Sequence, residues 1–399
     1  MTTVNLATPL RPDVSARARV DGLDTLRALA ILLVFMYHYM VFVSRVPTFG
    51  WASTIGWTGV DLFFVLSGYL IANQLFAGIV RGEKLSPRAF YVRRFLRTLP
   101  NYYVVLAAYL LFPALLGGRE PPPLWRFVTF TQNIQLQPGT AFSHAWSLCI
   151  EEQFYLLLPL VLLAALRWGR SIRGAWIALG LLMLAGIVIR GVLWSQHGRE
   201  VDGGYYPYIY YSSICRFDEF LPGIAVALLK NFHRETWARM LRCGQSWLLA
   251  GVASTAVTAA LLLRYYQIED YGYGFAMTAV GYPMIALSFA LLLIAALSPR
   301  SWLHRIRVPG AAALAAWSYA IYLSHKPLAN VLLGGLTPLG IEANSFAAVL
   351  LIGAACTLVG WLLYRLVESP FMRLRDRHWP TNFQRSARSS PSAALGAKA

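Results

Sequence analysis

The chain has 399 residues, of which 57% are hydrophobic and only 13% are charged. This composition is far more apolar than that of ordinary soluble domains, so it indicates a protein embedded in a lipid bilayer. The formal net charge of +17 does not indicate nucleic-acid binding, because the basic residues are spread between apolar segments and form neither a zinc-finger spacing nor an RNP-like motif.

Apolar runs long enough to span a membrane alternate with short polar segments along the chain. They cover about residues 23–45, 57–78, 98–117, 145–166, 174–195, 246–263, 276–297, 310–334 and 345–366. A shorter apolar run covers about residues 214–230. We therefore predict an all-α integral membrane protein, folded as a bundle of about ten transmembrane helices.

The distribution of lysine and arginine predicts the orientation of this bundle. With the N-terminus in the cytoplasm, the cytoplasmic segments hold about five times as many basic residues as the opposite loops. The positive-inside rule therefore places both termini in the cytoplasm. We predict a cytoplasmic segment at residues 1–20, a membrane domain at residues 21–375, and a disordered cytoplasmic tail at residues 376–399, which is rich in Ser, Ala and Pro.

The loops on the opposite side carry several aromatic residues. We interpret these residues as anchors at the membrane interface, although a platform on which sugar rings stack is an alternative. They are Trp51, Trp125, Tyr205, Tyr206, Tyr208, Tyr210 and Tyr211.

The first apolar run reads LDTLRALAILLVFMYHY and contains two polar residues, Arg27 and His38, that are expensive to place in a membrane. Helical geometry puts them on one face, about 16 Å apart along the axis. We expect both side chains to face the interior of the bundle. The simpler alternative is that His38 bonds a neighbouring helix and that Arg27 reaches to the cytoplasmic interface.

The second run reads GWTGVDLFFVLSGYLI and contains Asp61, Ser67 and Tyr69. Asp61 could orient a histidine or a hydroxyl group, or lie at the membrane interface. Ser67 and Tyr69 are candidates for substrate contact, but the small pair Ser67 and Gly68 is equally typical of close helix packing.

The segment that follows, SPRAFYVRRFLRTLPNYY, contains Arg93, Arg94 and Arg97 at spacings of three and four residues. On a helix these spacings form one guanidinium face that suits phosphate groups. The ligand is either an anionic lipid headgroup or a nucleotide-tailed donor such as coenzyme A.

The fourth run begins SHAWSLCIEEQFYLLLPL and contains Trp146, Ser147, Glu151 and Glu152. Ser147 and Glu151 are four residues apart and share a helix face. Because adjacent glutamates point in different directions, we expect one to line a cavity and the other to pair with an arginine. Candidates for this arginine are Arg216 and Arg190.

A later run contains WSYAIYLSHKPL, in which His325 stands near Pro327. His325 could relay protons, or it could satisfy the backbone at a kink caused by the proline. The chain's four cysteines lie far apart without a CxxC pair, so we expect neither a metal site nor a redox dithiol.

Taken in order, these stretches resemble the acyltransferase type 3 family of integral-membrane O-acyltransferases. The resemblance covers about residues 21–375, and it rests on LDTLRALAILLVFMYHY, GVDLFFVLSGYLI, RRFLR, WSLCIEEQFYLLLPL, WSYAIYLSHKPL and VESPF. Arg27 and His38 match the family's arginine and histidine separated by ten residues, Arg94 and Arg97 its RxxR motif, and Glu151 the acid of its WSLxxE stretch.

The resemblance implies transfer of an acyl group, most simply acetyl, from a cytoplasmic acyl-CoA co-substrate to a hydroxyl group. The acceptor would be a carbohydrate or a macrolide-like natural product, and no tightly bound cofactor is expected. A neutral histidine suits the role of general base, so we assign it to His38, with Glu151 or Asp61 orienting its ring and Arg27 holding donor phosphates. An acyl-imidazole formed on His38 is the alternative scheme.

Longer members of this family carry an appended extracytoplasmic esterase-like domain, which this sequence does not include. We therefore expect the chain to act alone or to leave delivery of the acyl group to a partner. A multi-pass location in a bacterial cytoplasmic membrane is expected. The main alternative function is a transporter or flippase of a small polar substrate, since charges within spans also mark substrate paths. The sequence leaves the oligomeric state open.

Overall fold

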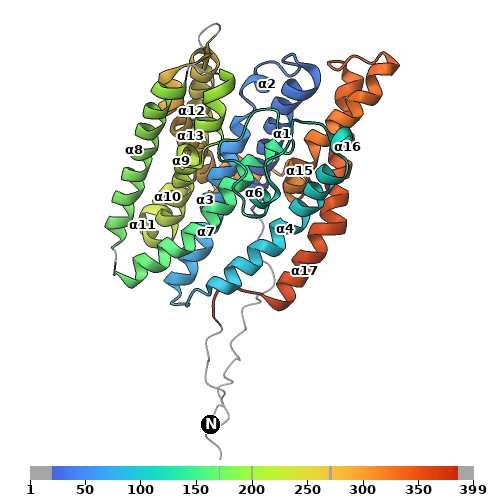
Figure 1. The fold of residues 1–399 in the computed structure, drawn as a ribbon. Helices are drawn as coiled ribbons and strands as arrows, with labels where there is room; N and C mark the ends of the chain where they lie inside the picture. Colours follow the sequence, from blue (N-terminus) through green and yellow to red (C-terminus); the bar gives the residue numbers. More distant parts are fainter. Residues whose placement is uncertain (1–19, 170, 199–200, 269–271, 385–399) are drawn as a thin grey trace, which may run out of the picture.

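The computed structural model describes residues 20–169, 171–198, 201–268 and 272–384, which form almost only helices (Figure 1). The longer helices are α1 (Asp21–Tyr39), α3 (Thr58–Val80), α4 (Pro87–Leu111), α7 (Trp146–Arg167), α8 (Ile172–His197), α10 (Leu221–Phe232), α12 (Gly244–Tyr265), α13 (Tyr282–Leu297), α15 (Ala311–Leu336), α16 (Phe346–Leu363) and α17 (Ser369–His378). The shorter α-helices are α2 (Trp51–Ile55), α5 (Pro113–Leu116), α6 (Leu124–Val128), α9 (Ser213–Arg216), α11 (Arg234–Arg242) and α14 (Trp302–Arg305).

Segments with other hydrogen-bonding patterns connect or extend these helices. The π-helical segments are η1 (Met40–Ser44), η3 (Val201–Tyr210), η5 (Met277–Gly281) and η7 (Tyr364–Glu368). The 3-10 helices are η2 (Ser143–Ala145), η4 (Phe217–Phe220) and η6 (Thr337–Leu339). Two short strands, β1 (Gln267–Ile268) and β2 (Gly272–Tyr273), pair in antiparallel orientation.

Seven helical stretches of the described chain are long and apolar enough to cross a membrane. They contain α1, α3, α7, α8, α12, α13 and α16. Two further long helices, α4 with 25 residues and α15 with 26, coincide with other predicted spans. The prediction of an all-α membrane protein is confirmed.

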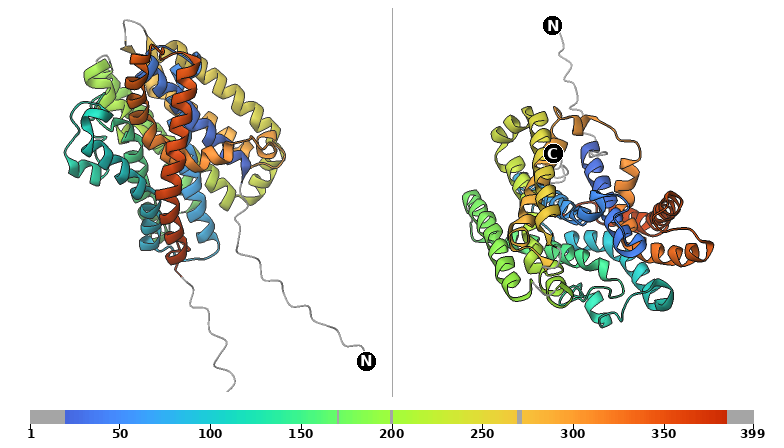
Figure 2. Two further views of the ribbon diagram at one scale, coloured as in Figure 1. Left: turned by 90° about the vertical axis from the view of Figure 1, so that its right-hand side faces the viewer. Right: turned by 90° about the horizontal axis from the view of Figure 1, so that it is seen from above.

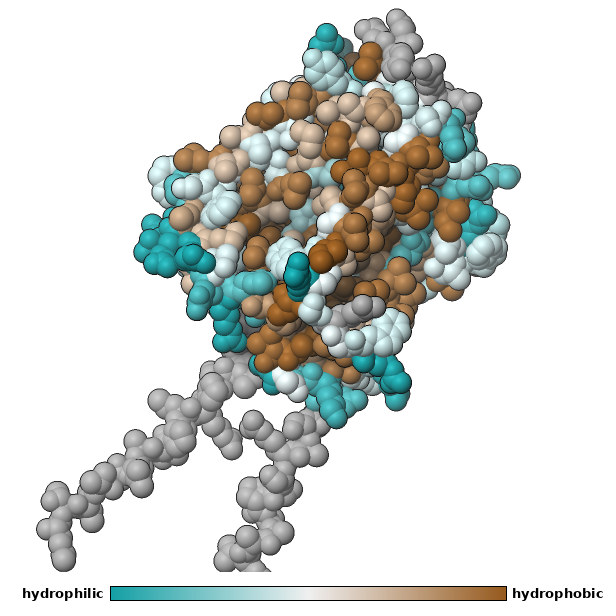
Figure 3. Space-filling view, turned by 90° about the vertical axis from the view of Figure 1, so that its left-hand side faces the viewer, coloured by the Kyte–Doolittle hydropathy of each residue, from teal (hydrophilic) through white to brown (hydrophobic). Residues whose placement is uncertain are grey.

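The bundle has a central layer and a periphery. In the apolar part of the span that contains α13, 72% of the residues are buried within the protein, and in α3 the share is 56%. In α8 only 11% of these residues are buried. α8 lies at one edge of the bundle and α16 at the opposite edge (Figures 1 and 2). Figure 3 shows that hydrophobic side chains cover much of the face bordered by α8, as a lipid-facing surface requires.

Close approach between α3 and α10 depends on glycine. A Cβ atom placed on Gly223 would lie 2.0 Å from the carbonyl oxygen of Val65, and one on Gly68 would lie 2.3 Å from that of Phe220. No real Cβ contact is this short, so the two helices pack backbone to backbone at these points. The interpretation of Gly68 as a packing residue is therefore confirmed.

The predicted interfacial anchors fall into three groups, of which Tyr206 and Tyr208 form the half-buried one. Trp51 and Trp125 are 66% and 59% exposed, as an interfacial position requires. Tyr205, Tyr210 and Tyr211 are buried, so the prediction was wrong for these tyrosines, both as anchors and as a platform for sugars. The reason is that η3 folds back into the bundle, where the Tyr205 hydroxyl donates a hydrogen bond of 2.9 Å to the hydroxyl of Tyr266.

The packed part of the chain extends beyond residue 375. Phe383 is buried against the loop after α3, and its ring occupies the space that a side chain on Gly78 would need. Residues 385–399 of the predicted tail and residues 1–19 of the predicted N-terminal segment lie outside the described residues.

We expect Gly223→Ala to destabilise the protein by about 1–3 kcal/mol, because the added methyl group overlaps the backbone of α3. The measurement is the thermal unfolding midpoint in detergent. Gly334→Ala in α15 is the matched control, since no atom lies within 4 Å of its added methyl group. Equal midpoints for the two variants would contradict this account of the α3–α10 contact.

Candidate active site

A cavity of about 740 Å³ opens among α1, α3, α4 and α7. Its volume lies within the range of small-molecule sites, which is about 300–1,000 Å³. Val20, Arg375 and Asn382 line it, so it opens at the end of the bundle where the described chain begins and ends.

At this end of the bundle, outside the membrane spans, an ion pair forms in the loop after α3. Arg81 donates two hydrogen bonds to Glu83, and these hydrogen bonds lower the pKa of the Glu83 carboxyl.

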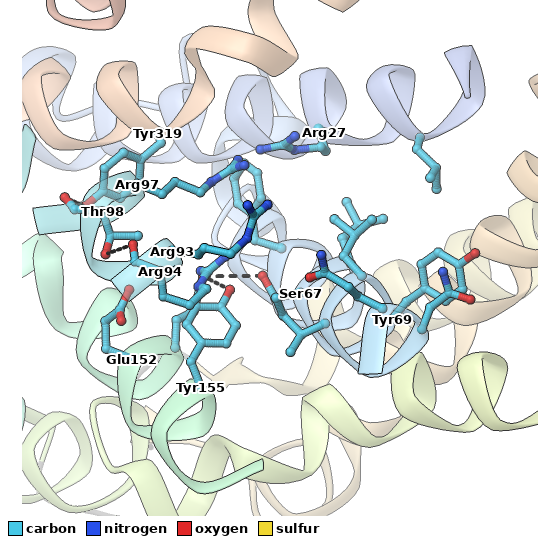
Figure 4. Close-up of a pocket in the computed structure, with 18 of the residues that line it drawn as sticks. Arg27, Ser67, Tyr69, Arg93, Arg94, Arg97, Thr98, Glu152, Tyr155 and Tyr319 are labelled. Carbon is cyan, nitrogen blue, oxygen red and sulfur yellow. Dashed lines mark hydrogen bonds between the residues drawn. The ribbon is translucent and has the colours of Figure 1, made fainter. Parts of the chain in front are cut away.

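Arg27, Arg93, Arg94 and Arg97 are among the six arginines that line the cavity. Arg27 comes from α1 and the other three from α4, and Figure 4 shows Arg27 and Arg97 pointing toward one another. The Arg94 guanidinium lies 3.7 Å from the centre of the Tyr155 ring, which holds it by a cation–π contact. The predicted guanidinium face of α4 is therefore directed into a cavity, where like charges that converge favour an anionic ligand.

Both glutamates of α7 line the same cavity. Glu151 accepts hydrogen bonds from the hydroxyls of Tyr155 at 2.7 Å and Ser67 at 3.3 Å. The expectation that one of the two glutamates pairs with Arg216 or Arg190 was wrong, because those arginines are engaged with other carboxylates in the core.

The inner part of the cavity is lined by hydroxyl groups. Tyr69 accepts a hydrogen bond of 2.8 Å from Lys230, and both residues line the cavity. Ser147 and Tyr322 also line it, and their hydroxyl oxygens are 2.6 Å apart. The Tyr322 hydroxyl donates to the backbone carbonyl of His144, so this pair joins the cavity to a group of histidines.

That histidine cluster consists of His38, His144 and His325. His38 Nδ1 lies 2.6 Å from His325 Nε2, and the two rings stack with centroids 4.9 Å apart. The His144 ring stands nearly perpendicular to both, at 6.5 Å from the His38 ring and 5.6 Å from the His325 ring. His144 and His325 are buried, and His38 is half-buried at the last turn of α1, just before the π-helical segment η1.

The backbone of α15 determines which ring nitrogens carry protons. His325 Nδ1 lies 3.1 and 2.8 Å from the carbonyl oxygens of Ile321 and Tyr322. Carbonyl oxygens only accept, so His325 Nδ1 carries the proton and its Nε2 is an acceptor. His38 must therefore donate from Nδ1 to His325, and its Nε2 keeps a free lone pair. This is the protonation state that a general base needs.

Pro327 explains the position of His144. A proline has no backbone N–H, so the carbonyl of Leu323, four residues earlier in α15, loses its helical donor. His144 Nε2 donates a hydrogen bond of 3.0 Å to that carbonyl. The proton is thereby assigned to Nε2, and His144 Nδ1 is left buried with a lone pair and no hydrogen-bond partner among the described residues.

A separate group of buried ions lies deeper in the bundle. Arg216 contacts Asp61 at 3.3 Å and also pairs with Glu219, and all three side chains are fully buried. The Trp146 ring packs against the Arg216 guanidinium. In the same group, Arg190 forms two hydrogen bonds of 2.6 and 2.7 Å with Asp218. Both arginines are paired with carboxylates, so we interpret the group as structural.

The structure thus divides the predicted site residues among three places. The cavity holds Arg27, Ser67, Tyr69, Arg93, Arg94, Arg97, Ser147, Glu151 and Glu152. His38 and His325 lie in the histidine cluster, and Asp61, Trp146 and Arg216 in the buried ion group.

The expectation that Glu151 or Asp61 orients His38 differs from the contacts observed. His325 occupies that position instead, because α15 is the helix that packs along α1. Arg27 lines the cavity, whereas His38 is not among the residues that line it. Sequence reasoning did not select His144, although the free carbonyl that Pro327 creates was a signal that some donor must approach α15 there.

Metal binding has no support in the described residues, where no group of three or more His, Cys, Asp or Glu side chains is arranged to hold an ion.

Comparison with known families agrees with this site. A model of the acyltransferase domain matches residues 20–365. The chain belongs to this acyltransferase family. The predicted resemblance, and the prediction of an acyltransferase domain, are confirmed.

The chain is similar in sequence to O-acetyltransferases from several bacteria. The chain is 28% identical over 382 residues to the peptidoglycan O-acetyltransferase OatA of Listeria monocytogenes, covering 90% of this chain and 56% of that protein. It is 24% identical over 373 residues to the O-acetyltransferase OatA of Staphylococcus aureus, covering 89% of this chain and 57% of that protein. The chain therefore spans just over half the length of these relatives. No solved structure gives a significant match.

We expect His38 to carry its proton on Nδ1 at neutral pH, because His325 accepts from that nitrogen. Ring-nitrogen NMR shifts of histidine-labelled protein measure this directly. His325→Gln keeps an acceptor oxygen near the position of Nε2 and is expected to preserve the tautomer, whereas His325→Asn is expected to release it. A wild-type His38 protonated on Nε2 would contradict the assignment.

Proposed function

We propose that this protein is a membrane-bound O-acetyltransferase that moves an acetyl group from acetyl-CoA to a hydroxyl group of a carbohydrate. The observation that carries the proposal is the contact between the arginine-lined cavity and the histidine cluster. The arginine-lined cavity reaches Ser147 and Tyr322, and the Tyr322 hydroxyl donates to the backbone carbonyl of His144. The His144 ring lies beside that of His38, whose Nε2 is free. The family match gives the reaction class, and the names of the relatives support acetyl as the group transferred.

The arginine cluster is the proposed binding site for the donor phosphates. Guanidinium groups form paired, charge-assisted hydrogen bonds with phosphate oxygens. Arg27 and Arg97 converge at the end where the cavity opens, so the long pantetheine arm of the donor would extend inward toward Ser147. This arrangement separates the charged end of the donor from its reacting thioester, as transfer near His38 requires.

The proposed reaction is direct transfer with His38 as general base. The acceptor hydroxyl oxygen attacks the thioester carbonyl carbon while its proton passes to His38 Nε2. The tetrahedral intermediate collapses with cleavage of the carbon–sulfur bond, and the thiolate of coenzyme A takes the proton from His38. One ester and one thiol result from one thioester and one hydroxyl. His325 accepts from His38 Nδ1 and holds the ring in place.

The acceptor proposed is a cell-wall polysaccharide or a related glycan. The Listeria relative is named for peptidoglycan, and a glycan of this kind provides free hydroxyl groups outside the cytoplasm. A macrolide-like acceptor has no comparable support.

The proposed topology has ten spans with both termini in the cytoplasm of a bacterium, across its cytoplasmic membrane. The seven apolar spans, the long helices α4 and α15, and the short α9–α10 segment together make up this number. The excess of arginine in segments that include α4 and α17 supports the orientation.

We expect purified wild-type protein in nanodiscs to release free thiol from acetyl-CoA in the presence of a glycan acceptor. His38→Ala should lower the rate about 10²–10⁴-fold, as loss of a general base does. Binding of acetyl-CoA should remain, because His38 does not line the donor cavity.

Two results would count against the proposal. Equal rates for wild type and His38→Ala would remove His38 from the reaction. Absence of acetyl-CoA binding to the wild type would favour transport of a small polar substrate instead.

We expect Arg97→Gln to weaken acetyl-CoA binding about 10–100-fold, because a hydrogen bond to a charged group contributes about 1.5–3 kcal/mol. Isothermal titration of the nanodisc-bound protein measures the Kd. The matched control is Arg88→Gln, since Arg88 is an exposed arginine of the same helix that does not line the cavity. Equal weakening by both substitutions would show a general effect of surface charge and not a phosphate site.

A further inference from the structure

A second cavity, of about 340 Å³, lies beside the last turns of α4. It is separate from the arginine-lined cavity, and the two have no lining residue in common. Its lining comes from α4, from α5 with the loop that follows, from α6, and from residues just before η2. The members are Leu106, Tyr109, Leu110, Pro113, Gly117, Gly118, Arg119, Glu120, Pro121, Phe127, Ala141 and Phe142.

The chemistry of this lining fits a ligand with one apolar face and several hydroxyl groups. Tyr109, Phe127 and Phe142 provide buried aromatic rings, and the Tyr109 and Phe142 rings are 5.1 Å apart. The Tyr109 hydroxyl is buried without a hydrogen-bond partner among the described residues. Such an orphaned group is costly unless something fills the cavity and bonds it. Arg119 and Glu120 place charges at the exposed rim.

The second cavity also adjoins the histidine cluster. The rings of Phe142 and Tyr109 lie 5.2 and 6.3 Å from the ring of His144. His144 in turn contacts His38 and has an unpartnered Nδ1. Phe142 has a positive φ of 56°, which is a strained conformation for an aromatic residue and is typical of functional sites. His144 therefore contacts lining residues of both cavities, Tyr322 of the first and Tyr109 and Phe142 of the second.

We propose that this second cavity binds the sugar ring whose hydroxyl group receives the acetyl group. The Tyr109 hydroxyl is its buried hydrogen-bonding partner, and the His144 ring lies beside the Tyr109 and Phe142 rings of the lining. The inference rests on the proposed function, and it assigns the acceptor to a site that is distinct from the donor cavity.

Several observations favour a sugar over a lipid tail as the occupant. A lipid tail would leave the Tyr109 hydroxyl unsatisfied, whereas a pyranose ring stacks its C–H face on aromatic rings and offers hydroxyl groups to Tyr109. A volume of about 340 Å³ lies near the lower end of small-ligand sites, which is about 300–1,000 Å³. The reaction needs no group beyond those already named, since the hydroxyl proton passes to His38 Nε2.

The first test fills the cavity from its rim. Leu110→Trp places a large side chain in the lining, and Leu111→Trp is the matched control, because Leu111 is 71% exposed and does not line the cavity. The probe is a peptidoglycan-derived tetrasaccharide, and transfer of labelled acetyl is measured in nanodiscs. We expect Leu110→Trp to raise the acceptor KM by about tenfold or more, with the KM for acetyl-CoA unchanged. Leu111→Trp should match the wild type.

The second test removes the orphaned hydroxyl. Tyr109→Phe should raise the acceptor KM about fivefold, as the loss of one neutral hydrogen bond does. Tyr103→Phe, on the same helix and outside both cavities, is its control. Thermal unfolding midpoints of all four variants, together with their affinity for acetyl-CoA, report whether each protein is folded.

The outcomes separate the two proposals. If the wild type transfers acetyl but neither Leu110→Trp nor Tyr109→Phe changes the acceptor KM, the second cavity is not the acceptor site, although the proposed function stands. If the wild type releases thiol but does not acetylate the tetrasaccharide, a sugar occupant is excluded. If the wild type does not bind acetyl-CoA, both proposals fall.

Discussion

The hydrogen bond between His38 and His325 links α1 to α15, and the arrangement of the site depends on it. Each ring nitrogen of a buried imidazole needs a hydrogen-bond partner, because a nitrogen without one raises the free energy of the folded state. A nitrogen without a partner also keeps a lone pair that can accept a proton. His325 uses Nδ1 on its own helix backbone and Nε2 on His38. This leaves His38 Nε2 as the free base. Pro327 adds the third ring, because the Leu323 carbonyl that it frees accepts from His144.

Charge is balanced differently in the two polar regions of the bundle. In the buried ion group, Arg190 pairs with Asp218, while Arg216 pairs with Asp61 and Glu219, so no net positive charge is left to attract a ligand. Around the cavity, six arginines line the wall with two glutamates, while Asp376 and Glu368 lie near Arg93 and Arg97. Buried positive charge in excess of the lining carboxylates is tolerable only where solvent or an anion reaches it. The same residue type therefore stabilises the fold in one region and prepares a binding site in the other.

Membrane packing explains why these groups can meet. Because α3 and α10 touch at Gly68 and Gly223, side chains from other helices converge around them without a wide gap. The peripheral helices, such as α8, provide the lipid-facing surface. The polar site residues lie in the interior, where they contact one another or line a cavity.

The sequence by itself determined the local features of this protein. The length of the apolar runs predicted the helices, and the spacing of Arg93, Arg94 and Arg97 predicted that they share one helix face. Six motifs in a fixed order indicated the family. Only the tertiary structure decided which helices are neighbours. In the folded protein, His38 forms its hydrogen bond with His325 and not with Glu151 or Asp61. Arg216 pairs with Asp61, and His144 donates to the Leu323 carbonyl that lacks a helical donor because of Pro327. The physical reason is that hydrophobicity and helical period act within one segment, whereas these contacts join residues more than a hundred positions apart through packing that no single segment encodes.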